Sequence, residues 1–321
     1  MKLNTGLIFI RFMHDNLAIE KLRPARNLLN PDIPYHFLHE EEPGANGELQ
    51  KVNTIFLTGK ECSFKCLMCD LWKNTLTGPS PPGAILKQID YALSRLPAAD
   101  TIKLYNNGNF FDHKAIPPAD YPGITKRLQC YERVIVENHP RLCGESCVEF
   151  KRQLNGKLEI AMGIETIHPQ VLPKLNKQLI PEDFKQAANF LRSNDIDVRA
   201  FILLNPPYLT NREENIEWVL RTVQFAFESG AQCCSIIATR SGNGIMEKLA
   251  EQGLYAAPSL NTLEDVFDTA LSLKGGRVFV DTWDIGFLSN CPQCFQARRE
   301  RLEMMNLYQL VYQRVSCNCH A

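Results

Sequence analysis

The sequence predicts an α/β fold: a partial (β/α)6 barrel of the TIM type with an N-terminal extension and a C-terminal cysteine-rich segment. Three observations predict it. Short apolar runs alternate with segments of helical periodicity along most of the chain. The runs are apolar on both faces, which is typical of strands in a parallel sheet covered by helices. A cysteine cluster directly follows the first run, and functional residues of β/α barrels lie on the loops after strands.

The expected strands are short runs rich in β-branched residues. They span residues 53–59, 101–105, 133–137, 158–165, 198–204, 233–239 and 277–281. Between them, apolar residues that recur every three or four positions predict helices. These helices span residues 84–96, 181–193, 214–227 and 262–273, and a further helical stretch lies between the two last pairs of cysteines. Pro181 suits a first helical turn, and Thr262 is the candidate cap of its helix.

Three segments organise the chain. Residues 1–51 are rich in proline and charge, so we expect an irregular extension that ends in a turn at 44–47. Residues 52–275 hold the barrel. Residues 276–321 form the C-terminal cysteine-rich segment.

Composition excludes some classes of function. Lysine and arginine total 35 against 36 aspartate and glutamate, so no general basic surface exists to bind nucleic acid, although a local patch stays open. No apolar run approaches the roughly 20 residues that span a bilayer. The opening apolar block "LIFI" is too short for a signal peptide, and Met13 is an alternative start. We therefore expect a cytoplasmic protein without a membrane partner.

The chain has 12 cysteines. Cytosolic thiols stay reduced, so clustered cysteines there indicate metal binding or catalysis before disulfides. Seven fall into two clusters. We expect the other five to be small buried hydrophobic residues; they are Cys130, Cys143, Cys147, Cys233 and Cys234.

The first cluster is "CSFKCLMC", with Cys62, Cys66 and Cys69. Three thiolates on one loop can hold three irons of a [4Fe–4S] cluster and leave the fourth iron open to a small molecule. With this C-x3-C-x2-C spacing after the first barrel strand, the chain resembles the radical S-adenosylmethionine (radical SAM) superfamily over residues 52–245. The alternative is a zinc site completed by a distant ligand.

The resemblance implies that SAM binds the open iron through its amino and carboxylate groups. It also implies that an electron from the cluster cleaves the C–S bond of SAM. The 5′-deoxyadenosyl radical so formed abstracts hydrogen from a substrate, and the electron comes from a reducing partner such as flavodoxin or ferredoxin. The cofactor does the difficult chemistry and the protein orients it.

Further SAM contacts are implied by position in the family pattern. Met68 would lie against the adenine. The segment Asn107, Gly108 and Asn109 stands where the family has a Gly-Gly-Glu-like motif, here without the glutamate. The remaining implied contacts are Glu165, Arg199 and Asn205, the backbone of Ile236 to Ala238, and Arg240 at the mouth. For each residue, ordinary packing or solvent exposure is the alternative interpretation.

Within the superfamily, the chain resembles the radical SAM subunit of archaeosine synthase and its bacterial relatives, whose barrel is related to the elongator catalytic subunit. The segments that carry this resemblance are "CLMCDLW", "IKLYNNGNFFD", "GIET", "ILLNPPYLT" and "CPQC…CNC". The chain departs from the archaeal pattern at the first cluster, where the archaeal spacing is longer.

The second cluster pairs "CPQC" with "CNC" near the C-terminus. Four thiolates satisfy a structural zinc site, and they also suit an auxiliary Fe–S cluster. The ligands would be Cys291, Cys294, Cys317 and Cys319, with His320 as a substitute. The alternative is four unliganded thiols.

Three further residues are candidates for catalysis. Glu137 and His139 follow the third strand and are candidates for substrate binding or proton transfer. Cys143 is a candidate hydrogen donor, and it shares one face with Cys147 if that stretch is helical. The alternative for all of them is packing.

The favoured function is therefore a radical SAM enzyme whose substrate is unidentified, with a modified nucleoside in tRNA as one candidate. One alternative is an enzyme of small-metabolite biosynthesis. The other is a non-catalytic Fe–S or zinc protein that acts as a partner subunit.

Overall fold

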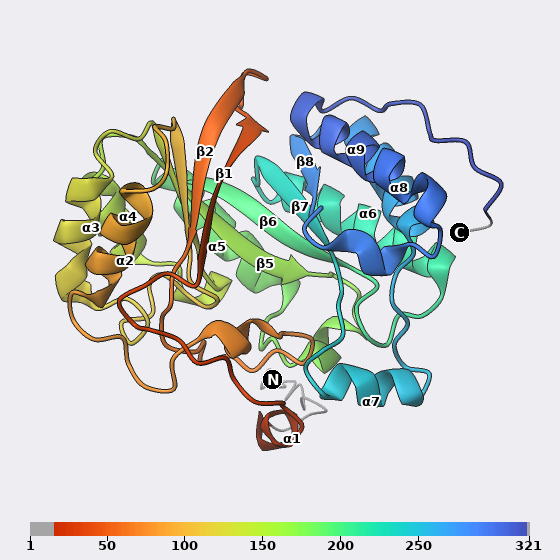
Figure 1. The fold of residues 1–321 in the computed structure, drawn as a ribbon, viewed down its shortest axis with the longest axis horizontal. Coiled ribbons are helices and arrows are strands. Elements are labelled where there is room, and N and C mark those ends of the chain that lie inside the picture. The colour runs from red at the N-terminus through yellow and green to blue at the C-terminus, as the bar shows by residue number, and fades with distance from the viewer. Residues whose placement is uncertain (1–15, 320–321) are drawn as a thin grey trace, which may run out of the picture.

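The computed structural model describes residues 16–319, and within them one eight-stranded sheet curls into a partial barrel (Figure 1). The strands lie in sequence order. They are β1 (His36–Pro43), β2 (Leu49–Phe56), β3 (Thr101–Tyr105), β4 (Arg133–Glu137), β5 (Lys157–Glu165), β6 (Asp197–Leu204), β7 (Cys233–Ala238) and β8 (Arg277–Val280). The predictions made for Met13 and His320 fall outside the described residues.

Strands β2 to β8 are parallel, which confirms the predicted barrel class and all seven expected strands. The prediction of an irregular segment up to residue 51 was wrong for β1, which pairs antiparallel with β2. Its sequence "HFLHEEEP" lacks an apolar run because it is an edge strand whose glutamates pair with cations of other strands. The turn at 44–47 is confirmed as the hairpin between β1 and β2, closed by the Gly44 amide donating to the Glu48 carbonyl. The three-segment division stays a prediction.

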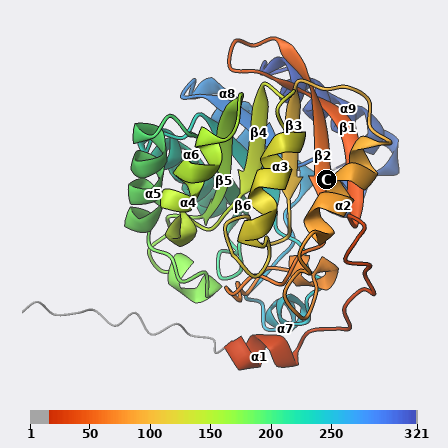
Figure 2. The same ribbon diagram turned by 90° about the vertical axis from the view of Figure 1, so that its left-hand side faces the viewer.

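Most helices cover the outer face of the sheet, as Figure 2 shows for α3 to α6, whereas α1 and α7 lie beyond one end of it in Figure 1. The predicted helices are confirmed, but α1, α3, α4 and α7 were not among them because they are too short to show a clear period. Thr262 is not a cap: Ser259 is the cap of α8 and accepts a hydrogen bond from the Thr262 amide at 3.1 Å. Among the described helices, none is long and apolar enough to cross a membrane. The helices are α1 (Asn16–Lys21), α2 (Ala84–Leu93), α3 (Tyr121–Arg127), α4 (Glu145–Arg152), α5 (Pro181–Ser193), α6 (Arg212–Glu228), α7 (Ile245–Glu251), α8 (Leu260–Ser272) and α9 (Pro292–Tyr308).

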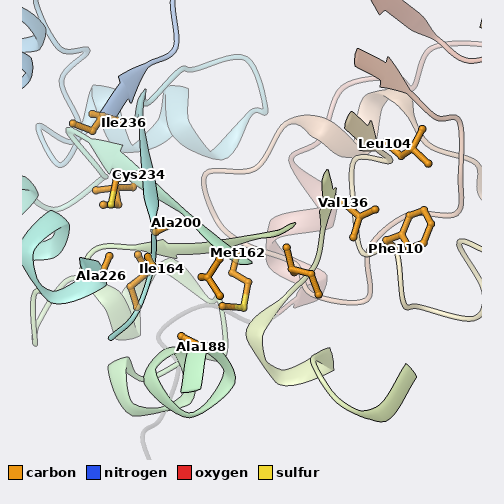
Figure 3. Close-up of a cluster of buried hydrophobic side chains, with 14 of the residues drawn as sticks. Leu104, Phe110, Val136, Met162, Ile164, Ala188, Ala200, Ala226, Cys234 and Ile236 are labelled. Atoms are coloured by element: carbon orange, nitrogen blue, oxygen red, sulfur yellow. The ribbon is translucent and has the colours of Figure 1, made fainter. Parts of the chain in front are cut away.

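The main hydrophobic core lies between the sheet and these helices (Figure 3). Alternate residues of successive strands face it, among them Leu104, Val136, Ala200 and Cys234, and Ala188 of α5 packs against them. Because side chains alternate along a strand, the other residues of each strand face the barrel interior.

Three of the five isolated cysteines are buried as expected, namely Cys147, Cys233 and Cys234. Cys143 is partly buried. Cys130 is exposed, because it lies in the turn before β4 rather than on a strand or helix.

The interior near the amino ends of the strands is filled by ion pairs. The Arg199 guanidinium lies 2.7 Å from a Glu159 oxygen and 2.9 Å from a Glu42 oxygen, and Lys103 lies 2.9 Å from both Glu40 and Glu42. Arg133 and Arg277 also contact Glu159. Burial alone would raise the pKa of Glu159, but the neighbouring guanidiniums hold it below its ordinary value. This network closes one end of the barrel and leaves the other end for a site.

The network predicts that loss of a buried carboxylate destabilises the fold more than loss of an exposed one. Glu159→Gln should lower the free energy of unfolding by about 3–5 kcal/mol at pH 7, because it leaves buried guanidiniums without their anion. The ionised carboxylate stabilises the fold only above its depressed pKa. The difference in free energy of unfolding between the variant and wild type should therefore begin to narrow as pH falls below about 4.3, the pKa of a glutamate in the unfolded chain. Urea denaturation at pH 7 and pH 4 measures both effects.

Glu145→Gln is the matched control, because the Glu145–Arg152 pair is exposed and such pairs contribute less than about 1 kcal/mol. An equal loss of stability in the two variants would contradict this account of the network.

Candidate functional site

The three cysteines of the first cluster lie on a loop that we call the cysteine loop (residues 60–72), directly after β2. Two other loops hold it in place. Asn176, after β5, donates to the Lys65 carbonyl at 2.7 Å. Asn243, after β7, donates to the carbonyls of Leu67 and Cys69 at 2.8 and 3.2 Å. The path of the loop is thus fixed by residues more than 100 positions away in the sequence.

Apolar packing supports the same loop. Leu67 is fully buried and packs with Ile19 of α1 and with residues of α7, at the lower end of the molecule in Figure 1. Met68, predicted to contact adenine, is partly buried and packs against the apolar clusters that contain Leu67 and Leu175. The adenine contact stays a prediction.

The segment before β1 clamps the loop from outside. Arg23 and Arg26 both pair with Glu61, and Arg26 also donates to the Trp72 carbonyl at 2.8 Å. The Arg23 guanidinium stacks over the Trp72 ring, 4.7 Å from its centre. No local sequence pattern indicates this clamp, because its two halves are about 40 residues apart.

The turn after β3 lies against the loop, as its resemblance to the family motif implies. The Asn109 side chain donates to the Cys62 sulfur at 3.1 Å, and its carbonyl oxygen accepts from the His139 amide at 2.7 Å. Asn107 has a left-handed backbone, with φ of 54°. The Glu137 carboxylate accepts from the backbone amides of Asn106 and Gly108 at 2.6 and 3.2 Å. Burial raises the pKa of Glu137 to about 7.

Glu137 therefore positions the turn. The predicted roles of Glu137 and His139 in substrate binding or proton transfer stay predictions. The His139 ring accepts from the Arg141 amide through Nδ1 and donates from Nε2 to the Lys177 carbonyl. It also stacks on Phe64 of the cysteine loop at 3.7 Å. Burial and the nearby Lys177 ammonium lower the pKa of His139 to about 3. The imidazole is neutral, and neither nitrogen is free.

The predicted hydrogen-donor role of Cys143 is not favoured. Its sulfur lies 3.5 Å from the Met162 sulfur and 3.5 Å from the Asn138 amide nitrogen, against the main core. Met162 is one of the core residues between the sheet and its helices (Figure 3). This position favours packing.

Glu165 ends β5 and forms a buried ion pair with Lys177 at 2.6 Å. Gly163 makes room for it, because a Cβ there would lie 2.3 Å from the Glu165 carboxylate and 2.7 Å from the Lys177 ammonium. Lys177 was missed by the sequence analysis: one lysine in a loop gives no signal until the fold brings it beside Glu165.

The prediction that Arg199 binds the SAM carboxylate was wrong. It is the third residue of β6 and its guanidinium is taken up by Glu42 and Glu159, at the opposite end of the strand from the site. The other predicted residues on these strands lie nearer the site, and their SAM contacts stay predictions. Asn205 directly follows β6, and Ala238 ends β7. The Ile236 carbonyl accepts a hydrogen bond from the Asp281 amide, and the Arg240 guanidinium forms an ion pair with the Asp281 carboxylate.

The donor set of the cysteine loop fits an iron–sulfur cluster. Burial raises the pKa of the Cys66 thiol to about 12, and it also raises the pKa values of Cys62 and Cys69. Such thiols are protonated at neutral pH unless a metal centre binds them, because metal coordination deprotonates a thiol. Three thiols on one loop suit three irons of such a cluster.

The four C-terminal cysteines come together beside α9. Their sulfurs all lie within 4.8 Å of one another, with Cys291 and Cys317 at 3.9 Å and Cys294 and Cys319 at 3.4 Å. A tetrahedral zinc with Zn–S bonds of about 2.3 Å has S–S edges of about 3.8 Å. The spacing matches a single tetrahedral ion.

Comparisons with known proteins agree with this geometry. No family model matches the chain. The uncharacterized protein MJ0550 of Methanocaldococcus jannaschii is 24% identical over 83% of this chain and 79% of its own length. Archaeosine synthase subunit beta of Methanosarcina acetivorans is 23% identical over 70% of this chain and 68% of its own length.

Among solved structures, the archaeal Elp3 of Methanocaldococcus infernus superimposes with a TM-score of 0.52 at 14% identity. The match covers 68% of this chain and 59% of the Elp3 chain, so this chain spans less than two thirds of that structure. The expected barrel is thereby confirmed, because the chain has the fold of this Elp3 structure. The similarity to archaeosine synthase subunit beta agrees with the resemblance inferred from the cysteine spacing.

Proposed function

We propose that this chain is a radical SAM enzyme that binds a [4Fe–4S] cluster through Cys62, Cys66 and Cys69 and cleaves SAM to abstract hydrogen from a substrate. The observation that carries the proposal is the cysteine loop itself. It follows the first parallel strand, it holds three partly buried cysteines, and two other strand-end loops fix its carbonyls.

When bound, the cluster and SAM supply a one-electron cleavage of the sulfonium C–S bond and a 5′-deoxyadenosyl radical. The chain supplies position. Cys62, Cys66 and Cys69 hold three irons, and the Asn109 amide steadies the Cys62 sulfur. Glu137 holds the turn before Asn109, so that its backbone faces the cysteine loop.

We propose that SAM lies across the carboxyl ends of the strands. Glu165 after β5, Asn205 after β6 and Ala238 at the end of β7 are the proposed contacts, together with Met68 and the backbone of the turn at 107–109. The Asn205 side-chain oxygen supports this arrangement, because it is buried and has no hydrogen-bond partner among the described residues. A bound ligand would satisfy it.

For the substrate, we propose a modified nucleoside in tRNA. The similarity to archaeosine synthase subunit beta supports this choice, and the net charge of −1 requires that any RNA contact be local. A small metabolite is the second candidate. The reducing partner, flavodoxin or ferredoxin, and the cytoplasmic location stay predictions.

At the C-terminal cysteines we propose a structural zinc ion. The sulfur spacing supports zinc, since a cubane would hold its thiolates on four separate irons and spread them further apart. The ion would tie the segment after α9 to its first turn and so stabilise the end of the chain.

Metal analysis of anaerobically purified protein tests both sites. A variant with Cys62, Cys66 and Cys69 replaced by alanine should lose about four irons per chain and keep about one zinc. Cys317→Ala/Cys319→Ala is the matched variant and should lose the zinc but keep the iron. Equal iron in wild type and the first variant would overturn the cluster assignment, and residual iron with sulfide there would make the C-terminal centre an Fe–S cluster.

Reconstituted and reduced protein should convert SAM to 5′-deoxyadenosine and methionine without added substrate, because the open iron presents SAM to the electron. Chromatography of the quenched reaction measures both products. The Cys66→Ala variant is the control and should form neither. If wild type with a full cluster also forms neither product, the chain is a non-catalytic partner subunit.

A further inference from the structure

We propose that Lys177 is a positioning residue that acts as a fixed cation beside the cysteine loop and favours the reduced form of the cluster. This inference rests on the proposed function. Neither the cysteine motif nor the comparisons assign a role to this lysine.

The first support is the position of Lys177. The residue is 7% exposed, and its segment is hydrogen-bonded to the cysteine loop on one side and to His139 on the other. The Leu67 amide of the cysteine loop donates to the Leu175 carbonyl at 2.8 Å, and Asn176 donates to the Lys65 carbonyl. On the other side, the Lys177 carbonyl accepts from His139 at 3.1 Å.

The backbone on either side of Lys177 is in the left-handed region. Asn176 and Gln178, the residues on either side of it, both have left-handed φ values, 52° and 56°. Asn176 ends the short helix Leu172–Leu175, where asparagine often adopts this region, but it is uncommon for a glutamine, and such residues cluster at functional sites. Gly163 leaves the space that the ammonium fills.

The second support is the charge that it faces. Burial alone would lower the pKa of Lys177, but the Glu165 carboxylate, 2.6 Å from the ammonium, raises it above its ordinary value. It therefore stays charged at neutral pH. Its neighbour Asn176 binds the carbonyl of Lys65, the residue directly before Cys66. The ion pair thus lies in a segment that is hydrogen-bonded to the cysteine loop.

Reduction adds one negative charge to a cluster bound by three thiolates. In a site of low dielectric constant, a fixed cation stabilises that charge and a fixed anion opposes it. Lys177 is the cation and Glu165 is the anion of one ion pair. Their charges should therefore shift the reduction potential of the cluster in opposite directions.

The test is a redox titration of the reconstituted [4Fe–4S] protein with dithionite, without SAM, followed by EPR. Lys177→Met should make the midpoint potential more negative by at least about 59 mV, which is a tenfold change in the equilibrium constant of a one-electron reduction. Glu165→Gln should move it in the opposite direction. A purely structural role for the ion pair would move both variants the same way or not at all.

Lys174→Met is the matched control. Lys174 lies three residues earlier in the same segment, but its ammonium lies over the Tyr208 ring at 4.9 Å, so its loss should leave the potential unchanged. An unchanged or more positive potential in Lys177→Met overturns the proposal. If that variant does not retain a cluster, Glu165→Gln decides, and any result other than a positive shift overturns it. Wild type that assembles no cluster would refute the proposed function instead.

Discussion

The structure depends on one constraint: a short loop of thiols must be held rigid without using the thiols to hold it. The chain does this with side-chain amides. Asn176 and Asn243 bind backbone carbonyls of the cysteine loop, and Leu67 anchors it in an apolar cluster. The sulfurs are therefore left for a metal. Because the two asparagines follow different strands, the loop is correctly placed only when the barrel is folded.

The barrel has two groups of ion pairs, one at each end of its strands. Near the amino ends of the strands, Lys103 and Arg199 are balanced by Glu42 and Glu159, and the network closes the interior. Near the carboxyl ends, the Glu165–Lys177 pair lies in a segment that is hydrogen-bonded to the cysteine loop. The first arrangement stabilises the fold, and the second sets the electrostatic surroundings of the proposed cluster. A parallel sheet makes this division natural, because all its carboxyl ends meet at one edge.

Much of the fold was readable from the sequence, because seven apolar runs and the spacing of Cys62, Cys66 and Cys69 are local patterns. β1 was missed because its glutamates are paired with cations from distant strands, which no local pattern shows. The same reason explains Arg199: its position in an apolar strand indicated function, yet its partner Glu42 lies 157 residues away. Lys177 was invisible in the same way, since only the fold brings it to Glu165.

The central claim is that three cysteines hold a cluster whose fourth iron is open to SAM. EPR of the anaerobically reduced protein, recorded before and after addition of SAM, tests it most directly. The account predicts a [4Fe–4S] signal whose g values change when SAM binds, and no signal from the C-terminal zinc. A cluster signal that is indifferent to saturating SAM, or no cluster signal after reconstitution, would contradict it.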